Sequence, residues 1–123
     1  MNVNTMNVLV VDDSKTMIRI ISNTLRRIGI ENIHQGLDGL EGLELFKKNK
    51  FDIVMTDWNM PNMNGLELVQ AIRKLDTEVP IIMVTTEGGK REVIKALKAG
   101  VNSYLIKPFT PEILRGKLKD IIF

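Results

Sequence analysis

The chain alternates between short apolar stretches and longer segments in which apolar residues recur every three or four positions. Stretches of the first kind, mostly rich in Val and Ile, are typical of buried β-strands and lie at residues 6–11, 32–35, 51–56, 81–84 and 103–106. Segments of the second kind have the apolar spacing of helices that pack on a core, and lie at residues 15–28, 39–49, 65–75, 90–99 and from 111 onward. The pattern predicts five strands alternating with five helices.

Turn and cap residues mark the ends of these segments. Asp13 and Ser14 precede the first helical segment, where side-chain oxygens can accept from free backbone N–H groups. Gly29 and Gly100 follow the first and fourth segments, in the position that favours a left-handed C-cap. Pro111 lies where the last helix would begin, a position at which its missing N–H is not needed. Local sequence therefore agrees with the alternation.

Strand–helix alternation predicts an α/β fold, a single doubly wound parallel sheet with helices on both faces. No linker, repeat or low-complexity segment interrupts the chain, so we expect residues 1–123 to form one domain without an output domain. In such sheets ligands bind beyond the carboxyl ends of the strands. The residues just past each strand are therefore the candidates for function.

Charged and hydroxyl side chains follow four of the five predicted strands. Taken singly, each is more often a turn residue or a solvated surface group than part of a site. Together they would gather three carboxylates, two hydroxyls and one ammonium at one sheet edge: Asp12, Asp13, Asp57, Thr85, Thr86 and Lys107. This joint placement predicts a functional site.

Three neighbouring carboxylates need a cation or bound protons. Two unit charges about 6 Å apart repel by roughly 3 kcal/mol at an effective dielectric constant near 20. Oxygen ligands without His or Cys favour a hard cation, and Mg²⁺ also bridges to phosphate. An aspartate can accept a phosphoryl group, whose charge a metal, a lysine and a hydroxyl would offset. The chain has no phosphate-cradling glycine loop, so ATP is not the expected donor.

Composition and charge narrow the function classes. The chain has no cysteine, which excludes disulfides and thiolate metal sites, and no apolar run long enough for a membrane span, so we expect a cytoplasmic protein without membrane contact. The net charge is +2, but residues 90–123 hold 8 basic and 3 acidic residues. This basic third could face nucleic acid or an acidic protein segment, or could be a solvated surface.

Four groups of residues resemble the bacterial response-regulator receiver domains. They are Asp12-Asp13, Asp57-Trp58-Asn59-Met60-Pro61 with Asn64-Gly65, Val84-Thr85-Thr86-Glu87, and Lys107-Pro108-Phe109. The resemblance covers residues 6–123 and is strongest to the single-domain receivers of chemotaxis, which share the 57–61 stretch and Tyr104. It implies a flavodoxin-like sheet of order 2-1-3-4-5 and a cis peptide bond between Lys107 and Pro108.

The resemblance also implies roles at the site. Asp57 would accept a phosphoryl group from a phosphohistidine on a CheA-like histidine kinase. Asp13, Asp57 and the backbone carbonyl of Asn59 would bind Mg²⁺, with Asp12 assisting through water. Lys107 would pair with the phosphoryl oxygens. The protein would promote only its own phosphorylation and dephosphorylation, and so would not be an enzyme in the usual sense.

Other residues would transmit the signal. Thr85 would swing toward the phosphoryl group and Tyr104 would turn inward, while Asn59 and Glu87 would set the lifetime of the phosphorylated state. The surface of the fourth helix, fifth strand and fifth helix would then bind a FliM-like flagellar motor switch protein. The resemblance favours an acidic protein partner and argues against binding of nucleic acid. It also implies that the protein is a monomer and that a phosphatase is a further partner.

Three other functions are compatible with parts of this sequence pattern. A phosphatase using Asp57 as nucleophile would need an acid two residues on, where Asn59 cannot protonate a leaving group. A flavodoxin-like cofactor binder would need a phosphate loop where Asp12 and Asp13 stand. A receiver with another output, such as a phosphorelay intermediate or a regulator of another protein, would have the same site and stays open.

Overall fold

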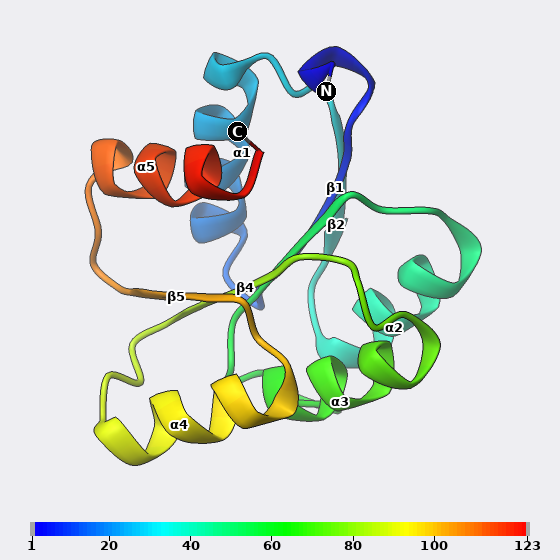
Figure 1. Ribbon diagram of the computed structural model, residues 1–123, viewed down its shortest axis with the longest axis vertical. Helices are drawn as coiled ribbons and strands as arrows, with labels where there is room; N and C mark the ends of the chain where they lie inside the picture. Colours follow the sequence, from blue (N-terminus) through cyan, green and yellow to red (C-terminus); the bar gives the residue numbers. More distant parts are fainter. Residues whose placement is uncertain (1, 123) are drawn as a thin grey trace.

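A computed structural model describes residues 2–122 as a five-stranded parallel sheet with helices on both faces (Figure 1). The strand order β2-β1-β3-β4-β5 is the one that the resemblance implied. The strands are β1 (Asn7–Val11), β2 (Asn32–Gly36), β3 (Ile53–Thr56), β4 (Ile81–Thr85) and β5 (Ser103–Ile106). The helices are α1 (Lys15–Ile28), α2 (Gly39–Lys48), α3 (Gly65–Leu75), α4 (Lys90–Ala99) and α5 (Pro111–Ile122). The predicted α/β fold is therefore confirmed.

The side chains of each central strand divide between two hydrophobic layers. In β1, Val8 and Val10 join the cluster under α1 and α5, whereas Leu9 and Val11 join the cluster under α2, α3 and α4. Figure 1 shows these two groups of helices on opposite sides of the sheet. All four side chains are buried, as expected for a parallel sheet covered on both faces. Burial on both faces explains why the central strands read as continuous apolar runs.

One predicted boundary is wrong by two residues. Strand β3 begins at Ile53, not at Phe51. Phe51 is buried, and its ring contacts His34 edge-on at 5.2 Å and stacks on Phe46 at 6.1 Å between centroids. The carboxylate of Asp52 accepts from the backbone N–H of Asn7 at 2.8 Å. Phe51 is thus buried because its ring packs on His34 and Phe46, and not because it belongs to β3.

Arg73, near the end of α3, anchors the end of α4. Its guanidinium donates twice to the carbonyl oxygen of Gly100, at 3.0 and 2.8 Å, and once to Asn102 Oδ1 at 2.9 Å. Asn102 Oδ1 also accepts from the backbone N–H of Ile81 at 2.8 Å. By contrast, the N-cap of α4 is Gly89, which has no side chain to accept from the first backbone N–H groups of the helix. The two ends of α4 are therefore held very differently.

Within residues 2–122, none of the helices has the length and apolar character required to cross a bilayer.

Candidate functional site

Two adjacent strands bring the acidic residues together. The register pairs Val11 of β1 with Thr56 of β3, so Asp12 and Asp57, the next residue of each chain segment, are neighbours at the sheet edge. Carboxylate oxygens of Asp12, Asp13 and Asp57 all lie within 4.8 Å of one another. Asp12 and Asp57 are buried, whereas Asp13 is exposed. The predicted three-carboxylate cluster is thus present.

Lys107 reaches this cluster from the end of β5. Its Nζ lies 2.7 Å from Asp12 Oδ2 and 3.2 Å from Asp57 Oδ2. Its backbone N–H donates to the carbonyl oxygen of Thr85 at 2.8 Å, which holds the start of the following loop against β4. The peptide bond between Lys107 and Pro108 is cis, as expected. Lys107 therefore lies with the carboxylates, as predicted, and is the one of the eight basic residues of segment 90–123 that contacts this cluster.

Burial and pairing act in opposite directions on these charges. Burial raises the pKa of Asp12 above its ordinary value, although hydrogen bonds from Lys107 and from the Ser14 N–H lower it. Burial alone would lower the pKa of Lys107, but the carboxylates of Asp12 and Asp57 outweigh it and the net pKa is raised. The ammonium therefore stays charged at neutral pH.

The loop after β3 holds Asp57 through backbone contacts. Asp57 Oδ1 accepts from the N–H of Trp58 at 2.7 Å, and the N–H of Gly65 donates to the Trp58 carbonyl oxygen at 2.7 Å. A Cβ on Gly65 would lie 1.9 Å from the backbone oxygen of Asp57. Only glycine therefore fits where α3 begins. The sequence motif contains this residue, but spacing alone gave no reason for it.

A second support for this loop was missed by the sequence reasoning. Asp38, the N-cap of α2, accepts from Asn62 Nδ2 at 2.7 Å and from the Glu41 N–H at 2.8 Å. The N–H of Gly39 donates to the carbonyl oxygen of Met63 at 3.1 Å. Asp38-Gly39 reads only as a helix start in the sequence, because its partners lie more than 20 residues away.

Glu87 connects the residues expected to tune and transmit the signal. Its carboxylate accepts from Asn59 Nδ2 at 2.8 Å, and its N–H donates to the hydroxyl of buried Thr85 at 3.2 Å. The hydroxyl of Tyr104 donates to the backbone carbonyl oxygen of Glu87. Burial, with the negative charges of Glu87, Glu92 and Asp57, raises the pKa of Tyr104 to about 12. Thr86 is exposed and makes no comparable contact among residues 2–122.

The donors present fit a hard divalent cation. Asp12, Asp13 and Asp57 offer only carboxylate oxygens, the ligands that Mg²⁺ prefers, and Asn59 stands two residues after Asp57 in the same loop. The Lys107 ammonium contacts Asp57 Oδ2, whereas the Trp58 N–H donates to Oδ1, so both oxygens of this carboxylate already have a partner. A carboxylate so placed can act as a nucleophile toward phosphorus.

Comparisons with known proteins agree with this geometry. The family model of the response regulator receiver domain matches residues 8–119. A chemotaxis protein CheY homolog from Campylobacter jejuni is 57% identical over 120 residues, 95% of this chain and 92% of that protein. The solved structure of CheY4 from Vibrio cholerae has a TM-score of 0.88 and 36% identity, over 94% of this chain and 98% of that one. A CheX–CheY complex with beryllofluoride and Mg²⁺ from Borrelia burgdorferi has a TM-score of 0.92 and 26% identity, over 96% and 90%.

Proposed function

Because the chain belongs to the response regulator receiver family, as a CheY-like chemotaxis receiver, we propose that Asp57 is its phosphoacceptor and that phosphorylation changes binding of a protein partner. The observation that carries this proposal is the position of Asp57. It is buried at the end of β3, beside the Lys107 ammonium and within 4.8 Å of two further carboxylates. A structural aspartate would not need this concentration of like charge.

The phosphoryl donor is a phosphohistidine on a CheA-like histidine kinase. A carboxylate oxygen of Asp57 attacks phosphorus, the P–N bond to imidazole breaks, and the electron pair leaves with the ring nitrogen. Lys107, 3.2 Å from Asp57 Oδ2, offsets the charge of the transferred oxygens. The Thr85 hydroxyl, now accepting from the Glu87 N–H, is the nearby donor that would move to the new oxygens.

Asp13, Asp57 and the Asn59 backbone carbonyl would hold Mg²⁺, with Asp12 acting through water. When bound, the cation supplies charge neutralisation at the phosphoryl oxygens. The Borrelia burgdorferi CheY complex, which contains both Mg²⁺ and beryllofluoride, supports this assignment by similarity. Asn59 and Glu87, joined by a 2.8 Å hydrogen bond, flank the acceptor and would control access of hydrolytic water.

The signal passes to the face of α4, β5 and α5, which we propose binds a FliM-like motor switch protein in the cytoplasm. Tyr104 joins this face to the site, because its hydroxyl donates to Glu87 in the loop before α4. The face carries exposed apolar residues among its lysines: Ile94, Leu97, Ile106 and Ile113. Seven basic residues of the 90–123 segment remain once Lys107 is assigned to the site. Such a face suits an amphipathic acidic segment.

Phosphorylation of Asp57 is tested by intact-mass measurement with Mg²⁺ and acetyl phosphate. The full chain should gain one phosphoryl group, and Asp57→Asn should gain none. Mg²⁺ should also raise the thermal midpoint, because it binds only the folded cluster. Equal incorporation in the variant, or no midpoint shift at millimolar Mg²⁺, would refute the assignment.

The output is tested separately by calorimetry with the N-terminal peptide of the motor switch protein. Beryllofluoride, a phosphoryl mimic, should tighten binding about 5- to 150-fold, the range of a 1–3 kcal/mol coupling. Equal affinity with and without the mimic would refute the switch. Absence of binding in both states would favour the other function left open by the sequence, a relay intermediate or a regulator of another protein.

A further inference from the structure

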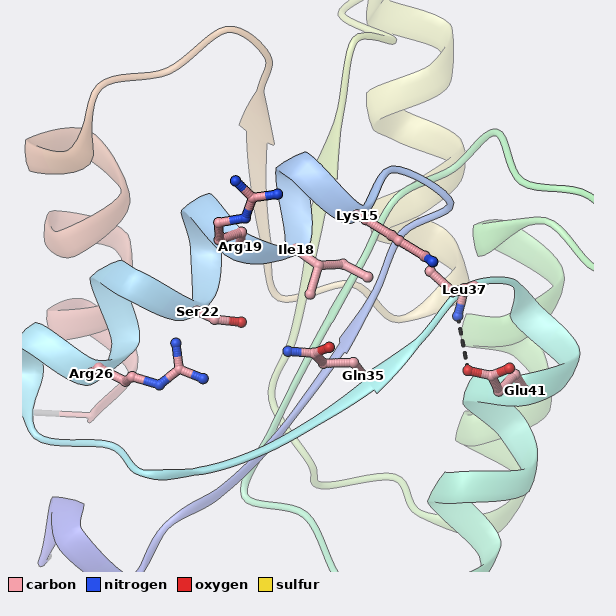
Figure 2. Close-up of a pocket in the computed structure, with 8 residues that line it drawn as sticks. All are labelled: Lys15, Ile18, Arg19, Ser22, Arg26, Gln35, Leu37 and Glu41. Carbon is pink, nitrogen blue, oxygen red and sulfur yellow. Dashed lines mark hydrogen bonds between the residues drawn. The ribbon is translucent and has the colours of Figure 1, made fainter.

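We propose that the cavity between α1 and β2 binds a phosphate-bearing small molecule of nucleotide size. The cavity is open to solvent on one side and has a volume of about 410 Å³, within the range that holds small organic ligands. Figure 2 shows its lining residues: Lys15, Arg19, Ser22 and Arg26 come from one side of α1, and the Ser22 hydroxyl and the Arg26 guanidinium lie toward Gln35 of β2. None of the residues of the acidic site lines it.

The first observation is an unpaired stripe of positive charge. Lys15, Arg19 and Arg26 lie on one side of α1, and like charges four residues apart destabilise a helix. Among residues 2–122, both ion pairs within 4.0 Å involve Lys107, so no carboxylate pairs with these three side chains. Arg26 Nη1 donates to Asn23 Oδ1 at 3.4 Å, and one carboxylate, Glu41, also lines the cavity. Three cations against one carboxylate leave the lining with a net positive charge, as a site for an anion would require.

The second observation is the buried hydroxyl of Ser22. Ser22 is only 1% exposed, and its Oγ has no hydrogen-bond partner among the described residues. In Figure 2 this hydroxyl points into the space bounded by Ile18 and Gln35, and the Arg26 guanidinium also points there. A buried hydroxyl without a partner destabilises the fold, whereas one that donates to a ligand oxygen does not.

The chemistry of the wall selects the ligand class. One carboxylate, Glu41, lines the cavity, but it already accepts from the Leu37 N–H at 3.1 Å and lies on the opposite side from Ser22 and Arg26 (Figure 2). The guanidinium group of Arg26 offers parallel N–H donors that match the oxygens of phosphate, and Lys15 and Arg19 add positive charge to the same side of α1. Ile18 and Leu37 provide apolar contact for an organic portion. A polyanion with two or more phosphates fits these features together.

The test is titration of the ¹⁵N-labelled full chain with ATP in EDTA at low salt. The largest saturable amide shifts should lie at Ser22 and Gln35, and binding should weaken as salt rises. Tripolyphosphate should shift the same amides and adenosine should not. Shifts confined to Trp58 and Lys107, or equal shifts with adenosine, would overturn the proposal.

Matched variants distinguish a specific anion site from nonspecific attraction of ATP to positive charge on α1. Arg26→Ala should weaken ATP binding about tenfold or more, since it removes a charge-assisted pair. Arg27→Ala removes the same charge from the same helix, but Arg27 does not line the cavity, so affinity should stay within about twofold. Ser22→Ala should weaken binding without lowering the thermal midpoint of the free protein. Equal losses in the two arginine variants would overturn the proposal, as would unchanged binding in Ser22→Ala.

Discussion

Lys107 is the only positive side chain in contact with Asp12 among the described residues, and Asp12 is almost fully buried. Replacing Lys107 by Met would leave that carboxylate buried without a partner. We expect Lys107→Met to lower the free energy of unfolding by about 3 kcal/mol in EDTA, since removing one member of a buried pair exposes the other to its full desolvation penalty. Urea denaturation measures this difference.

The matched control is Asp13→Asn, which removes an exposed carboxylate from the same cluster. This variant should be more stable than the wild type in EDTA, because it relieves repulsion without unpairing Lys107. If both variants were destabilised alike, the effect would come from packing and not from charge.

Tyr104 offers a direct test of the electrostatics next to the site. It is the one tyrosine of the chain, so near-ultraviolet absorbance follows its titration alone. The pKa of about 12 in the folded protein lies above the ordinary 10.0, so its contribution to stability is complete below pH 10 and is lost as the pH rises through 12. A midpoint near 10 in the folded protein would contradict burial of the hydroxyl against Glu87. Tyr104→Phe supplies the baseline.

At the scale of elements, two glycines inside helices differ in whether the surrounding structure leaves room for a side chain. A Cβ on Gly42 of α2 would lie 2.8 Å from Val11 Cγ2, so this glycine lets α2 approach β1 closely. A Cβ on Gly116 of α5 would meet nothing within 4 Å. Gly116→Ala should therefore stabilise the protein by up to about 1 kcal/mol, the helix-propensity difference between the two residues.

Gly42→Ala should instead destabilise by roughly 1–3 kcal/mol, because the core must shift to admit the methyl group. Thermal and urea unfolding of the two variants, measured side by side, test this contrast. A stabilising Gly42→Ala would show that α2 can move away from β1 at little cost.

At the scale of the whole molecule, charge is divided between a site that is acidic and a C-terminal third that is basic. Binding of an acidic peptide to the α4, β5 and α5 face should therefore weaken as ionic strength rises, whereas the ratio of affinities with and without beryllofluoride should change little. Calorimetry at several salt concentrations tests this. A salt-independent affinity would mean that the exposed apolar residues, such as Leu97, dominate binding.

Most of the fold could be predicted, because each central strand is buried on both faces and reads as a continuous apolar run. The carboxylate cluster could also be predicted, since Asp12 and Asp57 directly follow strands whose ends share one edge. The predicted start of β3 falls too early, at Phe51, because an apolar residue that is buried in a loop and one that is buried in a strand look alike in sequence. Gly65 could not be explained, since its reason is a backbone 1.9 Å from where a Cβ would lie.

The α1 cavity could not be predicted for a different reason. Residues 1–89 hold 9 basic and 12 acidic residues, and this net negative sum hides Lys15, Arg19 and Arg26 among acidic residues of other elements. Lys107 could be placed at the acidic edge because it directly follows a predicted strand, although the charge count alone includes it in the basic C-terminal third. Sequence gives the sum of charges, but the side of an element on which each charge lies comes only from packing.

The Arg73 contacts make α4 a lever with a fixed pivot. Its C-terminal end is fastened at Gly100, while its other end follows Gly88 and Gly89 without a side-chain cap. For a helix of 10 residues, about 15 Å long, a tilt of about 10° would displace the free end by about 3 Å and the pivot hardly at all. We therefore expect Arg73→Ala to leave phosphorylation of Asp57 unchanged but to reduce the effect of beryllofluoride on peptide affinity. Without the contacts of Arg73 to Gly100, both ends of α4 can move, so a change at the site no longer produces one defined tilt of the helix. An unchanged effect in that variant would place the pivot elsewhere.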